Sequence, residues 1–499
     1  MNDIQTLAND LPDPVPAIID GRPVTAGHGV DLPVIYPATG ETVGHLRESD
    51  AVQVAAAVES SRAAFDHGAW PRMGVDERKD ILYRIRDVLR AHADELGRLE
   101  VLNTGLTLHN LPRHVERMAR NFEFFAEVIS TVSGEAYTQH PQYLTWVTRD
   151  PKGVGAMISP WNAPLALSSM RIASCIAFGN TCVLKPSEYT PLSVYRLVEL
   201  LHEAGLPPGV VNLVNGRGHV TGAALVSHPG VDMVGFTGGT DTGRRIMADA
   251  AARLKPTILE LGGKSANVIF ESADLDQALE GALLGIYSNN GQQCLAGSRI
   301  LVQRSIADAF IERFVERTRR IRVGDPVDPA TEVGPVCYEA HMRRVLSFVD
   351  IAREDGAELL VGGRQPAGLE RGWYVAPTAV RAPDSSARIC QEEIFGPFAT
   401  FLVFDDLDDA IRQANDSRFG LVAYVWSRDM ETVLKCSRRI RAGTIWVNTP
   451  MMRELRAPFG GMGESGVGRD GMRDSHLFFT EPKTTTVPLG ALDLQGFGR

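Results

Sequence analysis

The sequence is poor in cysteine and in long apolar runs. Its 499 residues contain six cysteines, and no two of them form a C-x-x-C pair. We therefore expect neither a disulfide framework nor a metal site, and we expect a reducing, cytoplasmic compartment. No apolar run reaches the ~18 residues that a membrane-spanning helix needs. Residues 1–16 lack a basic segment followed by an apolar core, so no secretory signal is predicted.

Basic residues are too few for a polyanionic partner. Lys and Arg total 51 against 61 Asp and Glu, which gives a formal net charge of −10. Nucleic acids and anionic membrane surfaces bind proteins through basic patches, so neither is expected as the main partner. Hydrophobic residues make up 44% of the chain, which is enough for large buried cores in several domains.

The spacing of apolar residues predicts an α/β protein. Helices are expected over 76–99 and 113–128, and short apolar runs then alternate with helical patterns from residue 154 onward. Near-continuous apolar runs are typical of parallel strands that are buried on both faces. The first series has expected strands at 154–158, 182–184, 210–214, 233–236, 258–261 and 268–270, with helices over 190–204, 217–228, 239–252 and 274–288. This alternation predicts a doubly wound sheet.

A second α/β series follows without a low-complexity linker. Its expected elements are strands at 300–302, 358–361, 399–404 and 422–426 and helices near 305–320 and 339–356. Two doubly wound, Rossmann-like regions that share a broad interface are therefore predicted. Polar strand-like stretches at 138–149 and 483–487 belong to neither region. They are expected to form either an arm that pairs with another subunit or a local surface hairpin.

Cys294 is the candidate nucleophile among the cysteines. It lies in residues 288–298, a small polar stretch whose glycines let the backbone and a ligand approach closely. Backbone N–H groups there are expected to lower the pKa of the thiol and to hold a developing oxyanion. The alternative is an inert buried thiol, as Cys175 and Cys182 are expected to be from their helix and strand patterns.

Two polar residues follow expected strands, where α/β sheets place their ligands. Glu260 ends an apolar strand before two glycines and is a candidate general base, unless it caps a helix or forms a surface ion pair. Asn162 lies between two prolines and is a candidate oxyanion donor, unless it only shapes a turn. Glycine-rich turns at 216–222 and 238–243 are suited to a pyrophosphate, although neither matches G-x-G-x-x-G and each can be only a tight connection.

Eight motifs in order resemble the aldehyde dehydrogenase superfamily over roughly residues 20 to 490. They are Pro160-Trp-Asn, Lys185-Pro-Ser-Glu188, Phe236-Thr-Gly-Gly239, Glu260-Leu-Gly-Gly263, Gly291-Gln-Gln-Cys294, Glu392-Glu-Ile-Phe-Gly-Pro397, Ala414-Asn-Asp416 and Pro458-Phe-Gly-Gly461. The resemblance implies the aldehyde dehydrogenase fold with a small β oligomerisation arm. It places an NAD-binding domain at 1–131 and 150–262, a catalytic domain at 263–455 and the arm at 132–149 and 480–499. A homodimer or homotetramer is expected.

The resemblance also implies a role for each matching residue. Cys294 would be the nucleophile and Glu260 the base, while Asn162 and the Cys294 N–H would hold the oxyanion. Lys185 and Glu188 would bind the adenosine ribose, Glu393 the nicotinamide ribose, and Phe395 would flank the nicotinamide. The other implied cofactor contacts are Ser159, Pro160, Trp161, Ser187, Gly218, Phe236, Thr237, Gly238, Gly239, Leu261 and Gly262. The Glu188 carboxylate would repel a 2′-phosphate, which favours NAD over NADP.

Two positions depart from the family pattern. Gly239 stands where many members have a serine that contacts the pyrophosphate, so backbone N–H groups would serve there. Gly463 stands where many have a lysine, and no role is assigned to it. The implied reaction passes through a thiohemiacetal and a thioester on Cys294, which Glu260 helps water to hydrolyse to a carboxylic acid.

Arginines bear on the identity of the aldehyde. Arg113, Arg117 and Arg120 share one helix face, and Arg453 and Arg456 precede the Pro-Phe-Gly-Gly turn. This pattern is similar to the branch that oxidises 2-hydroxymuconic and 5-carboxymethyl-2-hydroxymuconic semialdehydes. There, arginines matching Arg117 and Arg456 would bind the substrate carboxylate. The aromatic residues Phe124, Trp161 and Phe459 are candidates for the wall of an apolar channel, unless they only pack in the core.

Three other readings stay open. The arginines can simply pair with surface acids, which would leave a general aliphatic, aromatic or betaine-type aldehyde dehydrogenase. The same thiol can hydrolyse esters or thioesters. The chain can also be a catalytically idle binding protein on the same fold, although the intact Cys294, Glu260 and Asn162 weigh against this reading.

Overall fold

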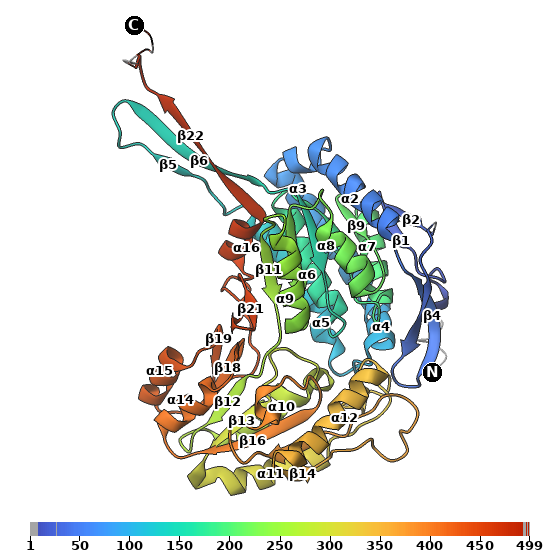
Figure 1. Ribbon diagram of the computed structural model, residues 1–499, viewed down its shortest axis with the longest axis vertical. Coiled ribbons are helices and arrows are strands. Elements are labelled where there is room, and N and C mark those ends of the chain that lie inside the picture. Colours follow the sequence, from blue (N-terminus) through green and yellow to red (C-terminus); the bar gives the residue numbers. More distant parts are fainter. Residues whose placement is uncertain (1–7, 26, 493–495, 497, 499) are drawn as a thin grey trace.

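The chain folds around two separate β-sheets, each covered by helices, with a β-arm that projects from the body (Figure 1). A computed structural model describes residues 8–25, 27–492, 496 and 498. The expectations for residues 1–16 and for the arm at 480–499 therefore fall partly outside the described residues. Within the described part of the chain, no helix has both the length and the apolar character needed to cross a membrane.

The first sheet has eight strands in the order β2-β1-β9-β8-β7-β10-β11-β21. The strands are β1 (Ala17–Ile19), β2 (Arg22–Val24), β7 (Val154–Ile158), β8 (Thr181–Lys185), β9 (Val211–Leu213), β10 (Met233–Thr237), β11 (Thr257–Glu260) and β21 (Gly466–Val467). Strands β9, β8, β7, β10 and β11 are parallel, and the chain order reverses next to β7. In such sheets ligands bind outside the carboxyl ends of the strands at this reversal.

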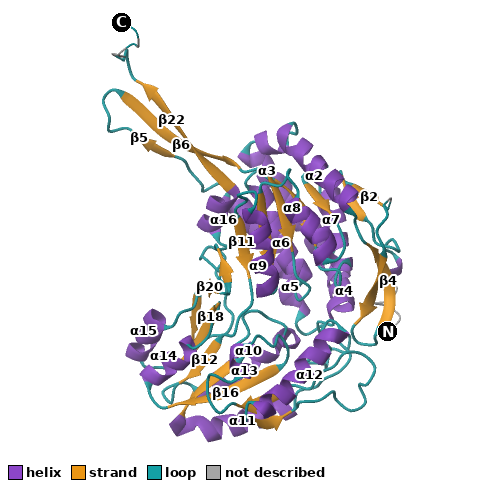
Figure 2. Cartoon of the chain, in the orientation of Figure 1, coloured by secondary structure: helices purple, strands orange, loops and turns teal. Residues whose placement is uncertain are grey.

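Helices cover both faces of the first sheet (Figure 2). One face carries α2 (Ala51–Asp66), α8 (Ala223–Ser227) and α9 (Thr240–Ala251), and the other carries α6 (Pro164–Ala177) and α7 (Leu192–Glu203). An outer layer packs on α6 and α7 and consists of α3 (Val75–Ala91), α4 (Ala93–Thr104) and α5 (Leu111–Val128). The single helix expected over 76–99 is wrong, because the chain breaks at His92 into α3 and α4.

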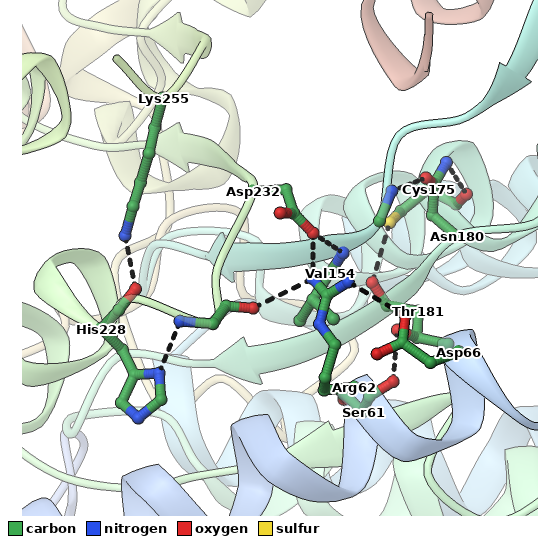
Figure 3. A network of polar contacts seen from close by, with 12 residues as sticks. Ser61, Arg62, Asp66, Val154, Cys175, Asn180, Thr181, His228, Asp232 and Lys255 are labelled. Carbon is green, nitrogen blue, oxygen red and sulfur yellow. Dashed lines mark hydrogen bonds and ion pairs between the residues drawn. The ribbon is translucent and has the colours of Figure 1, made fainter. Parts of the chain in front are cut away.

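A polar network anchors the amino end of β7 (Figure 3). The Val154 N–H donates to Asp232 Oδ2 at 2.7 Å, and the Arg62 guanidinium of α2 pairs with the same carboxylate. Nearby, Lys255 Nζ donates to the His228 carbonyl at 2.6 Å. These contacts join α2 and the turn before β10 to the central strand. They lie at the end of the strand opposite to its ligand-facing carboxyl edge.

The second sheet has seven strands in the order β14-β15-β16-β13-β12-β18-β19. They are β12 (Ala266–Ile269), β13 (Arg299–Gln303), β14 (Glu358–Val361), β15 (Thr378–Arg381), β16 (Phe398–Phe404), β18 (Val422–Trp426) and β19 (Thr444–Val447). Two hydrophobic cores pack against this sheet. One contains α10 (Leu275–Tyr287) and α11 (Ala307–Arg319). The other contains α12 (Glu339–Glu354), α13 (Arg388–Gln391), α14 (Leu407–Asn415) and α15 (Met430–Arg439). The predicted fold class, two doubly wound α/β regions with a small β-arm, is confirmed.

The arm consists of β5 (Glu135–Tyr137), β6 (Tyr143–Pro151) and β22 (Thr480–Pro488), which pair antiparallel and extend away from both sheets (Figure 1). Residues between 456 and 479, which no expected domain included, return to the first sheet through β21 and α16 (Met472–Phe479). The remaining short elements are β3 (Asp31–Tyr36), β4 (Glu41–Arg47), β17 (Phe419–Gly420), β20 (Met462–Gly463), η1 (Trp70–Arg72), η2 (Gly218–Gly222), η3 (Ser288–Gly291) and η4 (Arg304–Ile306).

Candidate active site

A cleft of about 490 Å³ lies where the carboxyl edge of the first sheet meets the loops that precede the second sheet. Twelve of the residues singled out from the sequence line it: Pro160, Trp161, Asn162, Thr237, Gly238, Gly239, Glu260, Leu261, Gly262, Cys294, Glu393 and Phe395. They come from five separate stretches of the chain. The structure therefore brings the candidate nucleophile, base and amide to one site.

Cys294 lies in the loop between η3 and β13. Gly291, the last residue of η3, packs closely on the backbone of Gly396, because a Cβ at Gly291 would lie 2.2 Å from the Gly396 carbonyl carbon. Gly291 also has φ of +73°. Burial raises the pKa of the Cys294 thiol to about 12, and the carboxylates of Glu393 and Glu260 add to the shift. The Cys294 backbone N–H opposes this shift but does not outweigh it. The expectation of a lowered thiol pKa is therefore wrong for the free chain, because burial outweighs the backbone N–H.

Asn162 is held against the same loop. Its Nδ2 donates to the Gln292 carbonyl at 2.9 Å, and Asn289 Nδ2 donates to the Asn162 carbonyl at 3.0 Å. An amide NH₂ has two donors, so one hydrogen remains for a developing oxyanion near Cys294.

Glu260 ends β11 with a buried carboxylate whose Oε1 has no hydrogen-bond partner among the described residues. Burial raises its pKa to about 8, and the nearby Asp470 carboxylate adds to the rise, while Arg171, Arg453 and Arg469 act against it. Arg171 and Asp470 form a buried ion pair at 2.8 Å behind the glutamate. A buried carboxyl that titrates near neutrality is suited to general-base work.

This environment predicts the pH dependence of a hydrolytic step that uses Glu260 as base. The ionised form is the active one, so the rate is expected to rise with pH and to level off above about 8. Asp470→Asn removes a negative charge and should move the rising limb to lower pH. The pH profile of kcat at saturating substrate locates the rising limb in the wild type and in the variant. A limb at the same pH in both proteins would contradict the assignment of Glu260 as the base.

Glu393 lies on the other side of the cleft. Its Oε1 accepts a hydrogen bond from the Gly263 N–H at 2.9 Å, and a Cβ at Gly262 would lie 2.3 Å from its Oε2. Burial raises the pKa of Glu393 to about 7, although the Gly263 N–H and Lys264 lower it. Phe395 has the left-handed φ of +62° and meets Trp161 edge-on at 5.2 Å between ring centroids.

Six further candidates lie near this edge but outside the lining of the cleft: Ser159, Lys185, Ser187, Glu188, Gly218 and Phe236. The Ser159 N–H donates to the Lys185 carbonyl at 3.1 Å, and Lys185 Nζ pairs with Glu188 at 3.3 Å. Gly218 begins η2 with open space around its Cα. They extend the site along the carboxyl ends of β7, β8 and β10. No group of three or more His, Cys, Asp or Glu within the described ranges could hold a metal ion.

A second cavity of about 790 Å³ opens between α5 and the loop before Phe459. Phe459 belongs to an apolar cluster against which Cys294 and Leu295 pack. Arg117 and Arg453 are half-buried in the cavity wall, and the Arg453 guanidinium lies 4.1 Å from the centre of the Phe459 ring. Arg456 instead has a 72% exposed side chain and pairs with Glu454 at 2.9 Å. The sequence singled out Arg456 together with Arg117 and assigned no substrate contact to Arg453, although both Arg453 and Arg456 line this cavity.

Comparison with known proteins identifies the family of the chain. The model of the aldehyde dehydrogenase family matches residues 24–485. The 5-carboxymethyl-2-hydroxymuconate semialdehyde dehydrogenase of Escherichia coli is 42% identical over 87% of this chain and 93% of that protein. A betaine aldehyde dehydrogenase of Mesorhizobium japonicum is 39% identical over 95% and 97%.

A solved structure agrees in the whole fold. The betaine aldehyde dehydrogenase of Staphylococcus aureus in complex with NAD+ superposes with a TM-score of 0.97 at 35% identity, covering 100% of this chain and 99% of that one. The family model spans most of the sequence, and relatives close to 40% identical cover nearly all of it. The chain therefore belongs to the aldehyde dehydrogenase family.

Proposed function

We propose that the chain oxidises, with NAD, an aldehyde that carries a carboxylate remote from the reacting carbon, such as a 2-hydroxymuconic semialdehyde. The observation that carries the substrate class is the arrangement of Arg117 and Arg453. Among the described residues, neither guanidinium pairs with a carboxylate, and Arg453 Nε is buried without a partner. Unpaired guanidinium groups in a cavity beside the nucleophile are suited to a substrate carboxylate.

The electrostatics of the two arginines support this proposal. Burial lowers the pKa of Arg117 to about 9, and the Arg453 charge lowers it further. Burial also lowers the pKa of Arg453. Arg117 Nε donates to the neutral Asn121 side-chain amide, whose Oδ1 accepts at 2.9 Å. An anionic group between the two guanidinium ions would relieve their mutual repulsion.

The cleft fits a dinucleotide cofactor. Gly239 caps the N-terminus of α9, and no atom lies within 4 Å of the position that a Cβ would occupy there, which leaves room for a pyrophosphate at a helix end that favours anions. Glu188 beside Lys185 disfavours a 2′-phosphate, and the related Staphylococcus aureus structure contains NAD+. Bound NAD supplies a hydride acceptor.

The residues of the chain perform the remaining chemistry. The Cys294 sulfur attacks the aldehyde carbon, and the Asn162 amide with the Cys294 N–H stabilises the oxyanion; such a donor typically contributes ~3–4 kcal/mol. After oxidation the substrate is a thioester of Cys294. Glu260 then takes a proton from water, which attacks the thioester and releases the carboxylic acid.

The substrate class is tested by comparing kcat/KM for a muconic-type semialdehyde with kcat/KM for a neutral aldehyde of equal length. The carboxylate should raise kcat/KM by ~100-fold, because a guanidinium anchor orients the distant aldehyde. Equal values would reject the carboxylate anchor and favour a general aldehyde dehydrogenase. A higher value for betaine aldehyde would favour that branch instead.

Arg453→Met tests the anchor itself. We expect it to lower kcat/KM for the carboxylated substrate by ~100-fold more than kcat/KM for the neutral aldehyde, because loss of the Arg453 charge near Glu260 and Cys294 affects both substrates alike. Arg456→Met is the matched control, because Arg456 is exposed and already paired with Glu454. The reverse ranking of the two variants would return the anchor to Arg456, as the sequence alone suggested.

A further inference from the structure

The first turns of α12 bind the backbone of the segment that carries Glu393 and Phe395. His341 Nε2 donates to the Phe395 carbonyl at 2.7 Å. Arg344 donates through its two terminal nitrogens to the Glu393 carbonyl at 2.7 Å and to the Ile394 carbonyl at 2.9 Å. Three consecutive carbonyls therefore accept hydrogen bonds from two side chains one helical turn apart.

The bound segment has a conformation that needs support. Phe395 has φ of +62°, a region that non-glycine residues occupy only where their surroundings hold them there. A Cβ at Gly396 would lie 2.7 Å from Val345 of α12, so helix and segment are in direct contact. On its other side Gly396 touches the Cys294 loop at Gly291. The segment is thus enclosed between α12 and the loop of the nucleophile.

Aromatic contacts extend this arrangement to the first sheet. Tyr338, which precedes α12, stacks on Tyr189 with ring centroids 4.1 Å apart and an interplanar angle of 4°. Tyr189 follows Glu188 in the chain. Trp161 from the loop after β7 meets His341 edge-on at 5.1 Å. The start of α12 therefore contacts both halves of the cleft.

We infer that His341 and Arg344 are positioning residues, which hold Glu393 and Phe395 in the orientation that hydride transfer to the nicotinamide requires. The inference rests on the proposed roles of Glu393 and Phe395 in binding that end of the cofactor. Burial lowers the pKa of His341 to about 4, so the ring stays neutral and keeps the same donor near neutral pH. Neither side chain takes part in a covalent step.

His341→Phe removes the donor and keeps a ring of similar size. We expect kcat to fall by ~10- to 100-fold, because small displacements of a reacting group are costly. The deuterium isotope effect on kcat with a C1-deuterated aldehyde should rise, since hydride transfer becomes slower than the later steps. His341→Gln restores an N–H of similar reach and should recover most of the rate. Hydrolysis of an activated ester by Cys294 without NAD should stay within ~2-fold of wild type.

Arg344→Met gives an independent test if His341→Phe folds poorly. It should raise the isotope effect in the same direction, while Arg343→Met should not, because Arg343 on the same helix is exposed and pairs with Glu339. Equal losses of oxidation and ester hydrolysis, or an unchanged isotope effect in both variants, would overturn the inference.

Glu393→Gln distinguishes a failure of the positioning role of His341 and Arg344 from a failure of the cofactor role of Glu393. If it changes the isotope effect and the KM for NAD while the α12 variants change neither, the positioning role fails and the role of Glu393 stands. If Glu393→Gln changes neither quantity, its cofactor role fails and the positioning role fails with it.

Discussion

Cys294→Ala is expected to lower NAD-dependent aldehyde oxidation by at least ~10⁵-fold, because no covalent intermediate can then form. The affinity for NAD should remain within ~3-fold of wild type, since the missing sulfur lies at the aldehyde side of the cleft. NADH absorbance measures the first quantity and titration calorimetry the second.

Cys436→Ala is the matched control for this variant. Cys436 is the buried residue of α15, packs in a core of the second sheet and does not line the cleft. Its replacement is expected to lower the free energy of unfolding without changing kcat. Full activity of Cys294→Ala would eliminate the thiol mechanism, and loss of NAD binding in that variant would show that the substitution had damaged the whole cleft.

Glu260→Gln is expected to lower steady-state turnover by ~100- to 1,000-fold while the first turnover still proceeds. The amide cannot take a proton from water, so the thioester persists after oxidation. Stopped-flow mixing with aldehyde and NAD should show one rapid equivalent of NADH per active site, followed by a slow phase. A steady rate equal to that of wild type would identify another base.

Absence of the rapid phase would carry a different meaning. Burial raises the pKa of both Cys294 and Glu260, and the Glu260 carboxylate raises the pKa of the Cys294 thiol further. A missing first equivalent of NADH would therefore show that Glu260 also takes the thiol proton before attack.

Much of the fold follows from local patterns in the sequence. The buried strands β7, β8, β10 and β11 appear as near-continuous apolar runs, and the structure places each within one or two residues of its expected bounds. The helix α2 was missed because it is rich in alanine and has little contrast between its faces. The break at His92 was missed because apolar spacing continues across it.

Local sequence patterns predict less of the candidate active site than of the fold. Motifs named Cys294, Glu260 and Asn162, but burial, which no local pattern reports, decides the pKa of the thiol and of the carboxyl. Arg171 and Asp470 are 299 positions apart and form a pair only in the folded chain. Arg453 and Arg456 are three residues apart and both line the cavity, but only tertiary packing leaves the Arg453 Nε buried without a partner while the exposed Arg456 pairs with Glu454.

The most direct measurement is peptide mass mapping of Glu260→Gln after one turnover with NAD and aldehyde. An acyl group on the peptide that contains Cys294, in one-to-one ratio with NADH, is the predicted result. NADH production with an unmodified Cys294, or an acyl group on any other cysteine, would contradict the assignment of this sulfur as the nucleophile.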